Sequence, residues 1–367
     1  MPLTVEQINA AMRTVKDPDI GKDLVTLGML KDVSVNGDDV TVGIELTTPA
    51  CPMKDKIRGD TEAAIASAAR SAGAAPPRVH VNFTADVRKA NDKVKDGHNP
   101  LPLVRNVIAV GAGKGGVGKS TVSVNLAVGL ARFGASVGYL DGDIYGPSGP
   151  TMLGLDDVPT AARGSMLMPF EVHGIKAMTI GKLVDPDKAL VWRGPMAHGA
   201  FKQLATQTEW GALDYLVIDL PPGTGDVPLT LSQLLPLTGA VIVCTPQRVA
   251  QDDARRAVRM FEQLGVPILG VVENMSYFIG NDGVTYDIFG RGGAEVMAQV
   301  MGLPFLGRLP IHMKLRTNSD EGTPSRNWDA DPTLAAELDA ICQNTAAQVS
   351  MAAMHGRLQM PTISVTG

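Results

Sequence analysis

One short segment constrains the fold of this chain more than any other part of its sequence. It reads Gly113-Lys114-Gly115-Gly116-Val117-Gly118-Lys119-Ser120. An apolar run, Val107 to Val110, precedes it, and a stretch with helical spacing, Ser120 to Arg132, follows it. Glycines allow backbone N–H groups to turn inward around an anion, and a helix N-terminus adds a positive dipole. The segment therefore predicts a strand, a phosphate-binding loop and a helix in succession.

The loop has the G-x4-G-K-S spacing of nucleotide-binding P-loops, which predicts a site for ATP and Mg²⁺. Lys119 is expected to reach the outer phosphates, and the Ser120 hydroxyl can ligate magnesium. Thr121, at the start of the helix, is also expected to contact the nucleotide. The expected nucleotide-binding residues of the loop are Gly113, Gly115, Gly116, Val117, Gly118, Lys119, Ser120 and Thr121.

Further apolar runs alternate with helical stretches from residue 104 onward: Val137 to Leu140, Tyr215 to Ile218, Ala240 to Val243 and Ile268 to Val272. Continuous β-branched runs between helices are typical of a parallel sheet that is covered on both faces. We therefore predict an α/β fold with a doubly wound, mostly parallel sheet over residues 104–350. Residues 351–367 have no strong pattern and are expected to form a C-terminal tail.

The first 88 residues predict a separate small α+β domain. Helical spacing covers Val5 to Thr14 and Lys54 to Ala72, and strand-like runs cover Lys31 to Asn36, Asp39 to Leu46 and Arg78 to Phe83. The alternation of apolar and polar residues in the second run is the strand period. Residues 89–103 are polar at first and lack periodicity, so they are expected to form a linker.

Composition narrows the classes of function. A net charge of -5 disfavours a mainly electrostatic nucleic-acid binder. No apolar run reaches the roughly 18 residues of a membrane span, and the N-terminus lacks the pattern of a signal peptide. We therefore expect a cytoplasmic protein with neither a membrane nor a nucleic acid as its partner. The 3 cysteines, Cys51, Cys244 and Cys342, are expected to be reduced thiols.

Carboxylates follow two of the predicted strands. Asp141 and Asp143 come after Val137 to Leu140, and Asp219 comes after Tyr215 to Ile218. The carboxyl ends of parallel strands meet at the edge where open α/β sheets bind ligands. We expect Asp143 to position the attacking water, and Asp141 and Asp219 to support the magnesium ion. A lone aspartate after a strand is more often a turn residue or a helix cap, but two such residues beside a P-loop favour a nucleotide site.

The loop has an extra lysine, Lys114, directly after its first glycine. In this feature the chain resembles the deviant Walker A class, which includes septum-site and plasmid-partition ATPases and the nitrogenase iron protein. In narrower terms, the chain resembles the Mrp/ApbC family of iron-sulfur cluster carriers. The matching segments are GKGGVGKST, DGDIYGPSGPTMLG, WRGPM at 192 to 196, DYLVIDLPPGTGD, LTGAVIVCTPQ and GVVENMSYF at 270 to 278. The segment LTTPACP, which contains Cys51, is similar to the small iron-sulfur assembly domain that precedes the ATPase in many members.

This resemblance implies an ATP-hydrolysing homodimer that is switched by the nucleotide and serves iron-sulfur scaffold or client apoproteins. Lys114 would reach the nucleotide of the partner subunit and stabilise developing phosphate charge there. Asn274 would read the adenine edge, and Pro310 would line the adenine pocket.

The chain departs from the family pattern at the customary cluster site. A Cys-x-x-Cys pair usually follows the Asn-Met-Ser segment, but here residues 277 to 290 contain no cysteine. Asp282 and Asp287 would be hard, poor ligands for a cluster that needs thiolates. Cys51 is the remaining candidate, as a cluster ligand or a reactive thiol, because the following helix, Lys54 and Lys56 could favour its thiolate. A small residue packed at a turn explains Cys51 equally well.

Two other classes of function compete with the carrier. A positioning or regulatory ATPase like the septum and partition proteins would carry no cluster, but such proteins usually have a basic amphipathic C-terminal helix or a basic surface. The final residues of this chain contain a proline and a single arginine, Arg357. Electron transfer in the manner of the nitrogenase iron protein would need bridging cysteines that the second domain lacks.

Overall fold

The computed structural model describes residues 3–18, 20–90, 99–183, 194–223, 231, 234–280 and 282–358. The chain divides into two units, Met1–Arg88 and Lys89–Gly367, and each is described by itself. The polar stretch expected as a linker begins at the boundary between them. None of the helices in these ranges is long and apolar enough to cross a membrane.

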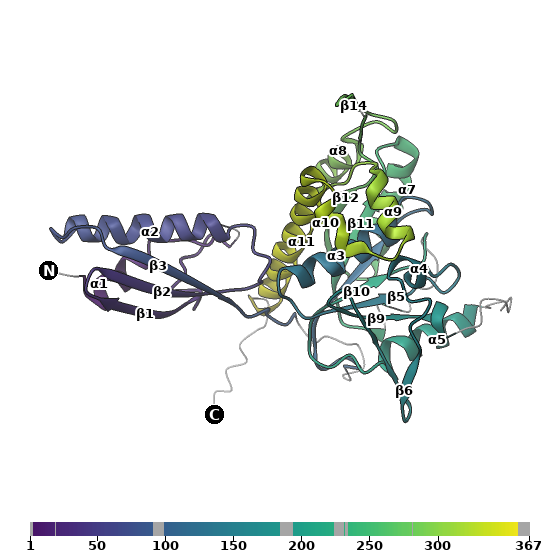
Figure 1. Ribbon diagram of the computed structural model, residues 1–367, viewed down its shortest axis with the longest axis horizontal. Helices are drawn as coiled ribbons and strands as arrows, with labels where there is room; N and C mark the ends of the chain where they lie inside the picture. Colours follow the sequence, from purple (N-terminus) through teal and green to yellow (C-terminus); the bar gives the residue numbers. More distant parts are fainter. Residues whose placement is uncertain are drawn as a thin grey trace. The chain divides into compact units, whose positions relative to one another are not determined.

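The first unit is a three-stranded sheet packed against two helices (Figure 1). Its elements are α1 (Val5–Met12), β1 (Leu30–Asn36), β2 (Asp39–Leu46), α2 (Lys54–Ser71) and β3 (Arg78–Ala85). β2 lies in the centre, antiparallel to β1 and parallel to β3. Every second residue of β2 is buried, among them Val42 and Ile44, and these side chains form a core with Ile8, Ile57 and Ile65. The alternation in the sequence therefore marks the face of the sheet that the helices cover.

The second unit is built on a sheet with strand order β15-β12-β11-β4-β10-β5-β9-β8. Neighbouring strands are parallel except β8 and β9 at one edge. The strands are β4 (Val104–Gly111), β5 (Val137–Asp141), β8 (Phe170–Val172), β9 (Ile175–Thr179), β10 (Leu213–Asp219), β11 (Leu237–Cys244), β12 (Ile268–Glu273) and β15 (Phe305–Arg308). The predicted doubly wound, mostly parallel α/β fold is confirmed.

Helices cover both faces of this sheet (Figure 1). α3 (Lys119–Arg132) and α11 (Pro332–Leu358) pack on one face, whereas α5 (Gly194–Thr206), α7 (Arg248–Gln263) and α8 (Gly293–Val300) contribute to the core on the other. The central strands are apolar on both faces, as burial between two helical layers requires. Shorter helices, α4 (Gly149–Met152), α9 (Met313–Asp320) and α10 (Asn327–Ala330), lie in the connections, as do the β-ribbons β6 (Ala161–Arg163) with β7 (Met166–Met168) and β13 (Phe278–Ile279) with β14 (Thr285–Tyr286).

The C-terminal boundary differs from the expectation. α11 continues to Leu358, eight residues into the segment expected to be a tail, and residues 359–367 lie outside the described residues. Ala346, Val349 and Ala353 on this helix are buried. Packing of this apolar stripe against the rest of the unit extends the helix past the point where the sequence pattern weakens.

Candidate functional site

The P-loop connects the end of β4 to the start of α3. Gly116 and Gly118 have positive φ angles of 78° and 79°, in the left-handed region that favours glycine. A Cβ atom on Gly118 would overlap the Asn274 side chain, and one on Gly113 would overlap the backbone carbonyl of Asp253. The loop therefore needs glycine at these positions for two separate reasons, backbone conformation and close packing.

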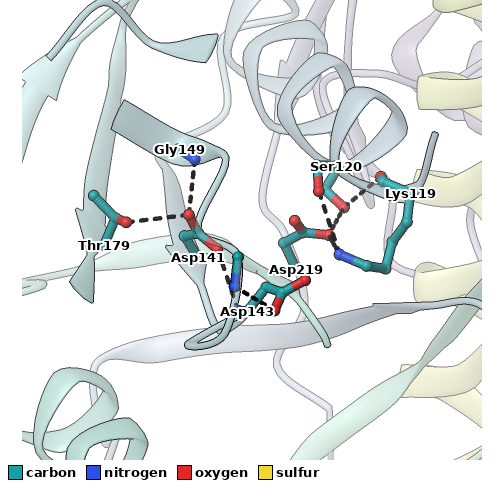
Figure 2. Close-up of polar contacts among 9 residues, drawn as sticks. Lys119, Ser120, Asp141, Asp143, Gly149, Thr179 and Asp219 are labelled. Carbon is teal, nitrogen blue, oxygen red and sulfur yellow. Dashed lines mark hydrogen bonds and ion pairs between the residues drawn. The ribbon is translucent and has the colours of Figure 1, made fainter. Parts of the chain in front are cut away.

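Lys119 and Asp219 form a buried ion pair at the floor of the site. Lys119 Nζ lies 2.6 Å from Asp219 Oδ1, and the two side chains are only 7% and 0% exposed. Lys119 also donates to Ser120 Oγ at 3.3 Å, and Ser123 Oγ donates to Asp219 Oδ1 at 2.7 Å. Figure 2 shows Asp219 between the start of α3 and the loop that carries the other two aspartates. Ser123 was missed by the sequence analysis, although it lies one helical turn after Lys119.

Asp141 and Asp143 lie beside this pair, as the sequence analysis expected. Asp141 and Asp219 are register partners on neighbouring strands. The oxygens of Asp141 accept hydrogen bonds from the Gly149 amide at 2.7 Å, the Thr179 hydroxyl at 3.1 Å and the Asp143 amide at 3.2 Å. These bonds hold the loop that follows β5 against the start of α4 (Figure 2).

The environment raises the pKa of both carboxyl groups of this loop. Burial, and then the nearby Asp219 carboxylate, raise the pKa of Asp141 to about 7. Burial also raises the pKa of Asp143, while Lys119 opposes that rise. Asp143 is half-buried near the start of the loop that follows β5. Raised carboxyl pKa values at one sheet edge are typical of functional sites.

The carboxylates and the Ser120 hydroxyl form a donor set that suits Mg²⁺. All are hard oxygen donors, which magnesium prefers. Asp219 Oδ2 is buried and accepts no hydrogen bond from the described residues. A buried carboxylate with an oxygen that lacks a donor is costly, so the Asp219 side chain is suited to gain a cation or a further donor. The residues present therefore fit a magnesium ion held near Ser120 and Asp219.

A cavity of about 730 Å³ lies beside the P-loop. Two residues expected to contact adenine, Asn274 and Pro310, both line it. Asn274 Nδ2 donates to the Val117 carbonyl at 2.8 Å, so the amide is fixed between the P-loop and the cavity. Thr121, which the sequence analysis expected to contact the nucleotide, also lines the cavity. The sequence analysis missed the other lining residues, which come from distant segments: Pro147, Ser148, Thr151, Met152, Met275, Phe289, Ile311, His312, Leu315, Arg316, Ser319 and Asp320.

Lys114 is half-buried at the start of the P-loop. The positive charge of Lys114 acts on the Cys244 thiol. Burial and the Glu273 carboxylate raise the pKa of this thiol to about 12, and the Lys114 charge opposes that rise. Segments WRGPM and LPPGTGD fall partly among residues that the structure does not describe, namely Trp192, Arg193 and residues 224–226.

One cysteine lies in the first unit and two lie in the second. Cys244 and Cys342 are buried in the second unit, and burial raises the pKa of both thiols. Cys51 is half-buried in the first unit, between β2 and α2. Lys56 pairs with Asp60 at 2.8 Å, and Lys54 lies over the Phe83 ring, 5.5 Å from its centroid.

The loop that usually carries the cysteine pair forms the ribbon β13–β14 instead. Asp282 in this ribbon accepts hydrogen bonds from the Tyr286 hydroxyl at 2.7 Å and the Val284 amide at 3.0 Å, and these bonds lower its pKa. Within the described ranges, no group of three or more His, Cys, Asp and Glu side chains is placed to hold a metal ion. Asp282 therefore serves the ribbon's own hydrogen bonding.

Comparison with known proteins identifies the family. Residues 103–346 match the NUBPL iron-transfer P-loop NTPase family, and residues 5–74 match a domain described as an iron-sulfur cluster assembly protein. An iron-sulfur cluster carrier protein from Synechocystis is 46% identical over 96% of this chain and 99% of its own length. Another from Escherichia coli is 50% identical over 67% of each chain.

Among solved structures, a nucleotide-binding protein from Archaeoglobus fulgidus in complex with ADP is 39% identical, with a TM-score of 0.55. The match covers 64% of this chain and 93% of that protein. The resemblance drawn from the motifs is confirmed by these relatives. The chain belongs to the NUBPL iron-transfer P-loop NTPase family, in the form that begins with an iron-sulfur cluster assembly domain.

Proposed function

We propose that this protein is an ATP-hydrolysing iron-sulfur cluster carrier or assembly factor that works as a homodimer switched by ATP. The observation that carries the proposal is the convergence of Lys119, Asp219 and Asp143 at one sheet edge, beside a cavity lined by Asn274 and Pro310. The Synechocystis relative, which is named an iron-sulfur cluster carrier protein and matches 96% of this chain, supports an iron-sulfur cluster as the cargo.

Each residue has a definite part in the proposed reaction. Lys119 turns from Asp219 toward the outer phosphates. Ser120 and Asp219 would hold a magnesium ion, which would supply positive charge beside the phosphates. The P-loop amides orient the phosphate chain. Asp143, two residues after β5 ends, accepts a hydrogen bond from the attacking water and aligns it with the terminal phosphate. Asn274 and Pro310 place the adenine in the cavity.

Hydrolysis is tested with the purified chain and two variants. Asp143→Asn should bind ATP with an affinity close to that of the wild type and hydrolyse it at least ~100-fold more slowly, because it loses the group that aligns water. Lys119→Ala should lose binding as well. An Asp143→Asn rate equal to the wild-type rate would remove Asp143 from the mechanism.

The role of Lys114 in a dimer is tested by mixing two inactive chains. A Lys114→Ala chain retains Asp143, and an Asp143→Asn chain retains Lys114. If the lysine acts across the dimer, the mixture should recover activity that neither variant has alone, because the mixed dimer holds one complete site. If Lys114 acts within its own subunit, mixing restores nothing.

The cargo is tested by anaerobic reconstitution with iron and sulfide. We expect cluster absorption bands in the wild type and loss of these bands in Cys51→Ser, since thiolates are the ligands that clusters require. Cys342→Ser is the matched control, because its thiol is buried. Transfer of the cluster to an apo iron-sulfur protein, followed by the recovery of that protein's spectrum, would establish the carrier role.

The competing function is a positioning or regulatory ATPase without a cluster. The absence of cysteine between residues 277 and 290 favours it. It requires ATP-dependent binding to liposomes or DNA, measured by co-sedimentation. Co-sedimentation together with a failure of reconstitution would replace the carrier by this second function, while the ATPase residues would keep their roles.

A further inference from the structure

Tyr139 is a fully buried tyrosine on the strand that ends at Asp141, next to the strand that ends at Asp219. It belongs to β5, two residues before Asp141, so both side chains point to the same face of the sheet. Its register partner on β10 is Val217, which precedes Asp219 by two residues. Tyr139 and Asp219 are therefore diagonal neighbours, a relationship that an aromatic side chain can bridge.

Two polar atoms in this region lack a hydrogen bond from or to the described residues. They are the Tyr139 hydroxyl and Asp219 Oδ2, and both are completely buried. Burial, followed by the charges of Asp219, Asp141 and Asp143 and by an interaction with the Asp219 side chain, raises the pKa of Tyr139 well above its usual range. The two side chains are therefore close enough to interact, although no hydrogen bond of good geometry joins them in this state. Buried polar groups without a hydrogen bond are rare in folded proteins.

In this state the described residues hold the Asp219 carboxylate through only one of its two oxygens. Lys119 Nζ and Ser123 Oγ both bond to Oδ1 of Asp219, at 2.6 and 2.7 Å, so the carboxylate is held from the side of α3 through one oxygen. When Lys119 turns to the phosphates, Asp219 loses this partner. A buried carboxylate that loses a partner must gain another donor or cation.

We propose that Tyr139 is a positioning residue for Asp219 in the nucleotide-bound state. Its hydroxyl donates a hydrogen bond to Oδ2 of Asp219. Oδ1 of the same carboxylate is then directed toward Ser120 and the proposed magnesium site. The hydrogen bond replaces part of what Asp219 loses when Lys119 leaves, and it fixes the rotation of the carboxylate. This proposal rests on the proposed ATP function, because it assigns a partner to Asp219 only when Lys119 contacts phosphate.

The test is Tyr139→Phe, with Tyr215→Phe as the matched control, since Tyr215 is also buried but lies on β10, farther from the edge. Three quantities are measured: the Mg²⁺ concentration that gives half-maximal ATP hydrolysis, the affinity for a fluorescent ATP analogue with Mg²⁺ or EDTA, and the urea midpoint without nucleotide. Loss of one hydrogen bond to a charged group predicts a rise of roughly tenfold in the required Mg²⁺ for Tyr139→Phe.

Two further results are expected from the same variant. Affinity in EDTA should stay within about twofold of the wild type, and the urea midpoint without nucleotide should stay equal or rise, because the hydroxyl that is removed was unpaired in that state. A merely structural hydroxyl would lower the midpoint and leave the Mg²⁺ requirement unchanged.

The proposal is overturned if Tyr139→Phe and the wild type need the same Mg²⁺ concentration, or if Tyr215→Phe shows the same shift. A wild-type chain that binds no ATP refutes the proposed function and this role together. Normal ATP binding by the wild type with an unchanged Tyr139→Phe refutes only the role of Tyr139.

Discussion

Lys119 and Asp219, one hundred residues apart in the chain, form a 2.6 Å ion pair that is almost completely buried. Removing one partner leaves the other charge buried and unpaired, which typically costs about 3–5 kcal/mol. We expect Lys119→Met to lower the free energy of unfolding without nucleotide by this amount, as measured by urea denaturation. The double variant Lys119→Met, Asp219→Asn should recover much of the loss. If the two changes were additive, the pair would not stabilise this state.

Gly113 and Gly115 offer a matched pair within one loop. A methyl group on Gly113 would overlap the Asp253 carbonyl, whereas one on Gly115 would lie 3.9 Å from Pro222. Gly113→Ala should therefore lower the stability by about 1–3 kcal/mol and weaken ATP binding, because two backbone segments would have to separate. Gly115→Ala should be nearly neutral for stability. Equal urea midpoints for the two variants would contradict the close approach.

A chain of side-chain amides, of which Asn125 and Asn327 are buried, joins α3 to α9, and α9 forms one wall of the cavity. Asn318 Nδ2 donates to Asn327 Oδ1 at 2.9 Å, Asn327 Nδ2 to Asn125 Oδ1 at 2.8 Å, and Asn125 Nδ2 to the Thr121 carbonyl at 2.8 Å. Asn327→Leu should weaken binding of ATP more than binding of tripolyphosphate, because α9 lines the cavity in which we place the adenine base. Calorimetry with both ligands measures this ratio. Asn344→Leu, which removes a bond to the Leu306 carbonyl, should leave the ratio unchanged.

The raised pKa of Asp141 predicts that the stability of the folded chain depends on pH. Its pKa is raised from 3.8 to about 7 in the folded chain. Between these values the folded chain retains a proton that the unfolded chain has lost, so this group makes stability fall as pH rises, by up to ~1.4 kcal/mol per unit. Asp141→Asn should flatten the slope of the unfolding free energy between about pH 4 and 7. Glu171→Gln, at an exposed position, should keep the wild-type slope.

The cysteines predict a simple labelling pattern. Cys244 and Cys342 are buried with raised thiol pKa values, and the reactive thiolate is therefore scarce at both. Cys51 is half-buried. Ellman's reagent at pH 8 should label one thiol per native chain rapidly, and Cys51→Ser should remove that phase. Rapid labelling of two or more thiols in the native wild type would show that the second unit opens.

The central strands and helices could be predicted because their signals are local. Continuous β-branched runs mark β4, β5, β10, β11 and β12, and alternation marks β2. The edge strands β8 and β15, and β9 beside β8, were not predicted, since three to five residues carry too little periodicity. The end of α11 was placed too early because packing, rather than local pattern, extends it.

The phosphate loop, the parallel sheet, the family and the aspartates at the strand ends could be predicted from the sequence, because each depends on residue types at short spacing. The contacts of these residues follow only from the folded structure. Lys119 meets Asp219, and Asn274 meets Val117, because the loops, strand end and helix that carry them come together when the sheet forms. Among the described residues, the fold also buries the Tyr139 hydroxyl and Asp219 Oδ2 without a hydrogen bond. Side-chain geometry and burial depend on long-range packing, which no local spacing encodes.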